Sequence, residues 1–126
     1  MANQTGGLVH TVDLTTRMTL APADWILCLE VAEHIPKQHE ETFLSNLHRH
    51  NRNGIVLSWS DNPGGNGHVN IRSNAWVIER FGRMGYAHDA ATQRALRRAV
   101  SDIHWYRDSI MVFRRPSVDA GRDAVV

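Results

Sequence analysis

The sequence contains one cysteine, one lysine and no long hydrophobic run. Cys28 cannot form a disulfide within the chain, so a reducing, cytoplasmic environment is expected. No stretch approaches the roughly 20 apolar residues needed to cross a bilayer, and residues 1–10 lack the charged and then apolar pattern of a secretion signal. These absences predict a protein that is neither exported nor inserted in a membrane.

The sequence also lacks an excess of charge of either sign. Fourteen Lys and Arg against thirteen Asp and Glu give a formal charge of +1, and the basic residues are scattered among acidic ones. Since nucleic-acid binding relies on gathered positive charge, a basic RNA-binding module gains little support. The 126 residues are enough for one domain with a modest core.

Apolar runs separated by turn formers predict strands alternating with helices. Strands are expected at 8–14, 25–31, 55–60 and 109–115; helices are expected from Pro36 to Gly54, from Ser73 or Asn74 to Gly85, and from about Asp89 to Val100. The glycine-rich segment 61–70 is expected to be a loop. This alternation is typical of a mostly parallel α/β sheet with helices on both faces.

Three polar segments follow the predicted strands, and ligands in such sheets bind beyond the carboxyl ends of the strands. Asp13, the segment "EVAEHIP" at 30–36 and the loop 61–70 are therefore expected to converge.

Two carboxylates and an imidazole lie within five positions of that second segment. Glu30, Glu33 and His34, with His68 from the glycine-rich loop, would supply the oxygen and nitrogen ligands that suit Mg²⁺ or Mn²⁺. The spacing alone is a weak signal. In the alternative, Glu33 and His34 cap the following helix and Glu30 pairs with an arginine.

Other chemistries have less support. No G-x-S-x-G motif surrounds Ser58 or Ser60, and "GGNG" lacks the G-K-[ST] of a phosphate-binding loop. Three of the four tryptophans fall within core patterns, and Trp105 alone is expected to be free as a surface platform.

Four segments resemble the second half of a class I S-adenosylmethionine-dependent methyltransferase: "DWILCLEVAEHIP", "GIVLSWS", "GHVNIRSNAWVIERFGRMGY" and "IMVFRR". The resemblance implies a Rossmann-like, three-layer αβα domain over 8–115 that is incomplete, running from the third strand onward, with an antiparallel last strand. On this comparison "VHTVDL" is similar to the third strand and "WILCLE" to the fourth. Residues 1–7 and 116–126 are expected to be flexible ends.

The resemblance also implies roles for individual residues. Some metal-dependent O-methyltransferases of this family carry E-x-x-E-H after the fourth strand, and the small-RNA enzymes add a histidine after the fifth. The matching metal ligands are Glu30, Glu33, His34 and His68, with His34 also a candidate proton acceptor in catalysis. The matching cofactor-binding residues are Asp13, Leu14, Glu30 and Val31.

The implied activity is transfer of a methyl group from S-adenosylmethionine to a hydroxyl oxygen, with Mg²⁺ or Mn²⁺ assisting. The acceptor would be a small hydroxylated molecule or an RNA 3′ end. The family's glycine-rich cofactor loop has no counterpart in the chain, so activity is expected to be impaired. The alternative is a truncated, non-catalytic domain that acts as a partner, with a homo-oligomer or a complementary chain covering its exposed sheet edge.

Overall fold

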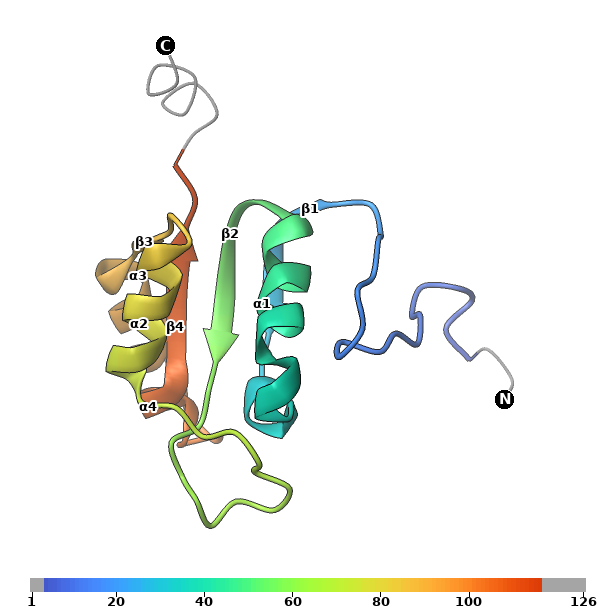
Figure 1. The fold of residues 1–126 in the computed structure, drawn as a ribbon. Helices are drawn as coiled ribbons and strands as arrows, with labels where there is room; N and C mark the ends of the chain where they lie inside the picture. Colours follow the sequence, from blue (N-terminus) through green and yellow to red (C-terminus); the bar gives the residue numbers. More distant parts are fainter. Residues whose placement is uncertain (1–3, 117–126) are drawn as a thin grey trace.

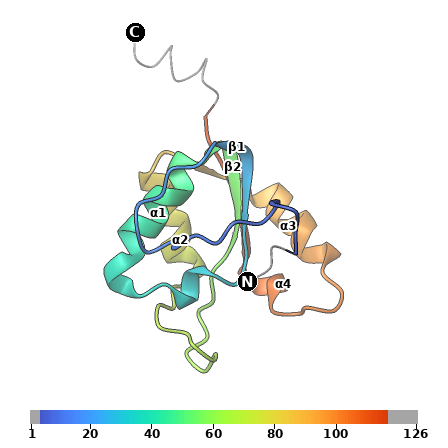
Figure 2. The ribbon, with the colours of Figure 1, turned by 90° about the vertical axis from the view of Figure 1, so that its right-hand side faces the viewer.

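The computed structural model describes residues 4–116 and shows one mixed sheet between two layers of helices (Figure 1). The strands are β1 (Ala23–Cys28), β2 (Asn51–Ser58), β3 (Ala87–His88) and β4 (Ile110–Arg114), in the order β1-β2-β4-β3. The helices are α1 (Glu40–Arg49), α2 (Asn74–Arg83), α3 (Ala90–Ala99) and α4 (Tyr106–Ser109), with 3₁₀ turns η1 (Ala32–His34) and η2 (Lys37–His39). Figure 2 shows α1 and α2 on one face of the sheet and α3 and α4 on the other, which confirms the three-layer α/β architecture.

The strand pairing confirms the antiparallel last strand. β1 and β2 run parallel, with Leu27 opposite Val56. β4 is antiparallel to both of its neighbours, β2 and β3. The expectation of a mostly parallel sheet is therefore wrong for the described residues, in which β1–β2 is the parallel pair and the chain returns through β4 in the opposite direction.

The prediction of a strand at 8–14 is wrong. This segment is not a strand in the structure, and it pairs with none of the four strands of the described sheet. The Asp13 carboxylate instead accepts hydrogen bonds from the backbone N–H and the hydroxyl of Thr15, which closes a turn. Beyond the turn, the buried Asn46 side chain of α1 donates to the carbonyls of Leu14 and Thr16. The chain is thus held against α1 at Leu14 and Thr16, whereas residues 8–13 are exposed and do not join the sheet.

Gly54 does not end a helix as predicted but lies inside β2. The helix α1 ends at Arg49, and β2 begins at Asn51. A Cβ atom on residue 54 would collide with the carbonyl oxygen of Phe113 on β4 and with the ring of Trp25 on β1. Glycine is needed here because its two neighbouring strands leave no room for a side chain.

The predicted starts of α2 and α3 are confirmed and both are capped, whereas Pro36 precedes the 3₁₀ turn η2 and α1 begins only at Glu40, without a side-chain cap. The Ser73 hydroxyl accepts the backbone N–H of Trp76 at the start of α2, and the Asp89 carboxylate accepts that of Thr92 at the start of α3. Gly85, with φ of +94°, follows the last turn of α2.

The core lies mainly between the sheet and the α1–α2 layer. It contains fully buried side chains from both strands and helices, and the rings of Phe81 and Phe113 stack with centroids 4.4 Å apart. The predicted inward residues Phe43, Leu44 and Leu47 of α1 all belong to this core.

The strand β1 forms an open edge of the sheet. Its continuous apolar run is typical of a strand covered on both faces, yet the Leu27 side chain is 71% exposed. An apolar groove of about 390 Å³ lies along β1, between it and the segment 14–21. Among the described helices, none is long and apolar enough to cross a bilayer.

We expect Gly54→Ala to destabilise the protein by about 1–3 kcal/mol, because the new Cβ overpacks the contact between β1, β2 and β4. The control is Gly82→Ala on α2, where a Cβ meets nothing within 4 Å. That change should stabilise the helix by roughly 0.5–1 kcal/mol. Urea denaturation measures both, and an unchanged midpoint for Gly54→Ala would contradict the packing described.

Asp89 should make stability depend on pH in the acid range. Hydrogen bonds from Thr92 and from the Arg114 guanidinium hold the pKa of this carboxyl well below its usual 3.8. Because the folded pKa is depressed, the contribution is complete above about pH 4 and is lost as the pH falls below that value.

We therefore expect Asp89→Asn to flatten the decline in stability below pH 4, measured by urea denaturation at several pH values. The control is Asp24→Asn, which removes the exposed pair of Asp24 with Arg52. If Asp89→Asn keeps the full acid dependence of the unchanged protein, the proposed contribution of Asp89 is wrong.

Candidate metal and cofactor site

Three of the predicted metal ligands lie together beyond the carboxyl ends of β1 and β2. Glu33 and His34 belong to η1, which follows β1, and His68 belongs to the loop that follows β2. One ligand atom from each residue lies within 4.8 Å of the others, and the two imidazole rings have centroids 5.2 Å apart. The spacing allows the three side chains to contact one small cation.

The Glu33 carboxylate is the unusual member of this group. Its side chain is fully buried, and neither carboxylate oxygen has a hydrogen-bond partner among the described residues. Burial raises the pKa of Glu33 most strongly, the residue's own backbone N–H lowers it, the nearby Glu30 carboxylate raises it, and the two histidines lower it. A buried carboxylate without partners is costly, and a bound cation would offset that cost.

The two histidines each have one ring nitrogen fixed by a backbone carbonyl. The Nδ1–H of His34 donates to the Gly67 carbonyl at 2.8 Å, and the Nδ1–H of His68 donates to the Asn62 carbonyl at 2.7 Å. Because a carbonyl only accepts hydrogen bonds, each Nδ1 carries a proton, and in the neutral ring the lone pair is therefore on Nε2. This arrangement is the one that metal-binding histidines commonly use.

Glycines in the loop make this ring placement possible. A Cβ on residue 65 would overlap the imidazole of His68. Gly67 has φ of +74°, a backbone conformation that glycine adopts readily, and its carbonyl is the one that holds His34. The glycines that predicted a loop therefore also allow the rings of His34 and His68 to take their observed positions.

Glu30 lies beside this cluster rather than within it. It has φ of +57°, uncommon for a residue with a side chain, and its backbone N–H donates to the Ser58 hydroxyl. Its Oε1 accepts a hydrogen bond from the indole of Trp105 at 3.1 Å. Trp105 is half-exposed, as its expected role as a surface platform requires, but its indole N–H is already bonded.

The predicted cofactor residues are divided between two places. Leu14 and Val31 line the same apolar groove along β1. Asp13 lies in its own turn, where hydrogen bonds from Thr15 lower the pKa of its carboxyl, and it is not a member of the Glu33 cluster. Of the three segments expected to converge, the structure brings together the second and third, because 8–14 is not a strand of the sheet.

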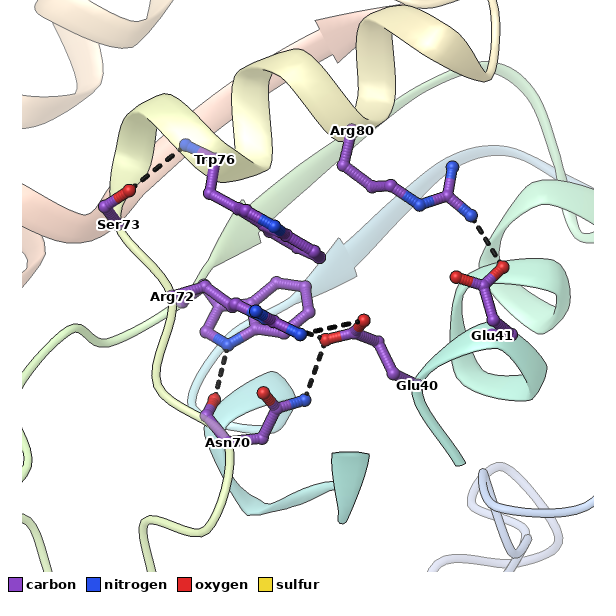
Figure 3. A network of polar contacts seen from close by, with 8 residues as sticks. Glu40, Glu41, Asn70, Arg72, Ser73, Trp76 and Arg80 are labelled. Atoms are coloured by element: carbon purple, nitrogen blue, oxygen red, sulfur yellow. Dashed lines mark hydrogen bonds and ion pairs between the residues drawn. The ribbon is translucent and has the colours of Figure 1, made fainter. Parts of the chain in front are cut away.

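A polar network missed by the sequence analysis holds the end of the His68 loop (Figure 3). The Glu40 carboxylate accepts hydrogen bonds from the side chains of Asn70 and Arg72. Glu40 lies in the first turn of α1, where the helix dipole favours an acidic side chain whether or not it has a partner. No local pattern signals an ion pair between residues 32 positions apart in the chain.

No protein-family model matches the chain, and no curated protein matches it in sequence. Similar solved structures include two crystal structures of magnesium protoporphyrin IX methyltransferase (ChlM) from Synechocystis PCC 6803. The structure with bound SAH has a TM-score of 0.61 and 17% identity, and the match covers 85% of this chain and 50% of that one. The structure with bound SAM has a TM-score of 0.57 and 19% identity, with 85% and 45% covered.

The chain thus spans about half the length of these methyltransferases. The match extends over most of the described strands and helices, in which the parallel β1–β2 pair is followed by an antiparallel β4. The chain therefore has a mixed α/β, Rossmann-like fold similar to that of about half of these methyltransferases.

Proposed function

We propose that the chain is a methyltransferase domain that transfers a methyl group from S-adenosylmethionine to a hydroxyl oxygen with the help of a divalent cation. One observation carries the proposal: the buried, unpartnered Glu33 carboxylate lies with His34 and His68 at the ligand-binding edge of a methyltransferase-type sheet. The proposal also agrees with the fold shared with enzymes crystallised with SAH and SAM.

The residues present fit Mn²⁺, and they fit Mg²⁺ only with further oxygen ligands, because two of the three clustered ligands are imidazoles and Mg²⁺ prefers oxygen. A carboxylate with two imidazoles is also the ligand set of open, catalytic zinc sites, whereas a closed structural zinc site takes a fourth protein ligand. Glu30 is proposed as a further ligand because its carboxylate is near enough to raise the pKa of Glu33. When bound, such a cation lowers the pKa of a coordinated hydroxyl and so activates it as a nucleophile.

The side chains of the cluster would bind the cation and shield it from water. Glu33 and His68 would hold the cation, and the burial of Glu33 excludes water from one side of it. His34 has two proposed roles, ligand and proton acceptor, and its single free Nε2 cannot fill both at once. We assign this nitrogen to the cation. In the metal-bound protein the proton of the acceptor hydroxyl would then pass to solvent, and His34 could accept a proton only when no cation is bound.

The methyl donor is proposed to lie along the groove that Leu14 and Val31 line, with Asp13 and Glu30 adjacent to them in the chain. A small hydroxylated molecule or an RNA 3′ end remains the proposed acceptor.

A second candidate role is favoured by the open edge of β1. The exposed Leu27 and the apolar groove suit one occupant in particular: a polypeptide segment that adds a parallel strand and a covering helix. The half-length match supports this occupant, because the similar methyltransferases carry about as many residues again as this chain matches. In this role the chain would be a non-catalytic partner.

Glu33→Gln should weaken Mn²⁺ binding at least about tenfold, because it removes the one anionic ligand of the three-residue cluster. His68→Ala should do the same, and His39→Ala, a nearby histidine outside the cluster, should leave the affinity unchanged. Water-proton relaxation enhancement measures the binding. Equal affinities for Glu33→Gln and the unchanged protein would remove the basis of the metal proposal.

S-adenosylhomocysteine should bind the chain in calorimetric titration, and Leu14→Asp should abolish the heat by placing a charge in the apolar groove. The control is Leu8→Asp, since Leu8 is 88% exposed and lies outside the groove. Titrations with and without Mg²⁺ separate donor binding from cation binding. Absence of heat in both would refute methyl transfer by this chain and favour the partner role.

A further inference from the structure

His68, one of the two histidines of the proposed metal site, lies in a loop without regular structure. Residues 59–73 contain neither helix nor strand, and the loop is rich in glycine and asparagine. Side chains on such loops keep a catalytic geometry only when the loop is anchored at fixed points. The residues that anchor the loop therefore decide where His68 lies.

We propose that Glu40 is a positioning residue for the metal site: its carboxylate anchors the end of the loop and through it holds His68 against Glu33. This inference rests on the proposed function, since it concerns the same cation. It assigns a role to a helix residue that does not belong to the ligand cluster.

The contacts of Glu40 are those of an anchor. Its side chain, the first of α1, is almost fully buried. The Oε1 atom accepts hydrogen bonds from Asn70 Nδ2 and Arg72 Nε, both at 3.0 Å, and Oε2 accepts one from Arg72 Nη2 at 3.2 Å (Figure 3). A two-point contact between a carboxylate and a guanidinium fixes orientation as well as distance.

The loop residues bonded to Glu40 are also held from other sides. The indole N–H of Trp59 donates to the Asn70 carbonyl at 2.8 Å, and the Arg72 backbone N–H donates to the Ser60 carbonyl. The Arg72 guanidinium lies 3.9 Å from the ring centre of Trp76 on α2, as Figure 3 shows. Residues 70–72 are thus fixed between the start of the same loop, just after β2, and the helices α1 and α2.

Asn70 connects this anchor to the metal ligands. The backbone N–H groups of Val69 and Asn70 donate to the carbonyl of Glu33 at 2.9 and 3.0 Å. His68 directly precedes these two residues in the chain. Loss of the Glu40 contacts would therefore loosen the loop where it meets Glu33, one residue from the imidazole that binds the cation.

The next residue on the same helix provides a matched control. Glu41 forms an ion pair with Arg80 of α2, so it also links α1 to α2. Its side chain is 73% exposed and it does not contact the loop (Figure 3). Glu40→Gln and Glu41→Gln are thus the same chemical change at neighbouring positions, and only the first affects residues 70–72.

The test measures the Mn²⁺ dissociation constant by relaxation enhancement for the full chain and its variants. We expect Glu40→Gln to weaken binding roughly 10- to 100-fold, in the range found when groups that orient metal ligands are removed. Glu41→Gln should change it less than twofold, and Arg72→Lys, which keeps the charge but loses the two-point contact, should fall between. Equal affinities for folded Glu40→Gln and Glu41→Gln would overturn the proposal.

Hydrogen exchange of the metal-free protein gives a readout that does not depend on the cation. The amides of Val69 and Asn70 should exchange faster in Glu40→Gln, while core amides of β2 keep their rates. If Glu40→Gln fails to fold, the exchange of the same two amides is measured in Arg72→Lys instead. If the unchanged protein does not bind Mn²⁺, the proposed function is refuted. If the amides of Val69 and Asn70 exchange at the same rate in Glu40→Gln as in the unchanged protein, the anchoring role of Glu40 is refuted.

Discussion

The backbone carbonyl of Glu33 holds the two halves of the candidate site together. It accepts the N–H groups of Val69 and Asn70, residues that follow a different strand and lie 36 and 37 positions later in the chain. This contact places His68 beside the turn that carries Glu33 and His34. Within residues 4–116, the hydrogen bond from the His34 ring to the Gly67 carbonyl also joins this loop to η1, and the Glu33 carbonyl adds the two backbone–backbone bonds next to His68.

The side chain of the same residue gives the site its chemical character. A carboxyl group could avoid the cost of burial by staying protonated, and burial indeed raises the pKa of Glu33. A divalent cation would lower the same cost by pairing with the ionised form, and a ring nitrogen of each histidine lies within 4.8 Å of a Glu33 carboxylate oxygen. The competition between a proton and a cation for Glu33 is therefore the physical basis of the proposed function.

Local signals in the sequence predicted much of this arrangement. Ser73 and Asp89 begin their helices because their side chains satisfy free N–H groups, and such capping depends only on neighbouring residues. The short spacing of Glu33 and His34 and the place of His68 in the loop after the next strand likewise predicted that these residues lie together.

Long-range packing decided the features that the sequence did not reveal. The segment 8–14 alternates like a strand, but Asn46 holds the residues after it against a helix. Gly54 has the position of a helix terminator, yet it is required by the ring of Trp25 on the adjacent strand. The contact between Glu40 and Arg72 joins two elements through an ion pair, and such pairs leave no periodic pattern.

A crystal structure of the chain grown with Mn²⁺ tests the central claim most directly, because anomalous scattering locates the metal independently of any assumed site. The account predicts an anomalous peak in contact with a Glu33 carboxylate oxygen and with Nε2 of His34 and of His68. A well-ordered Glu33 carboxyl with no peak beside it would contradict the account.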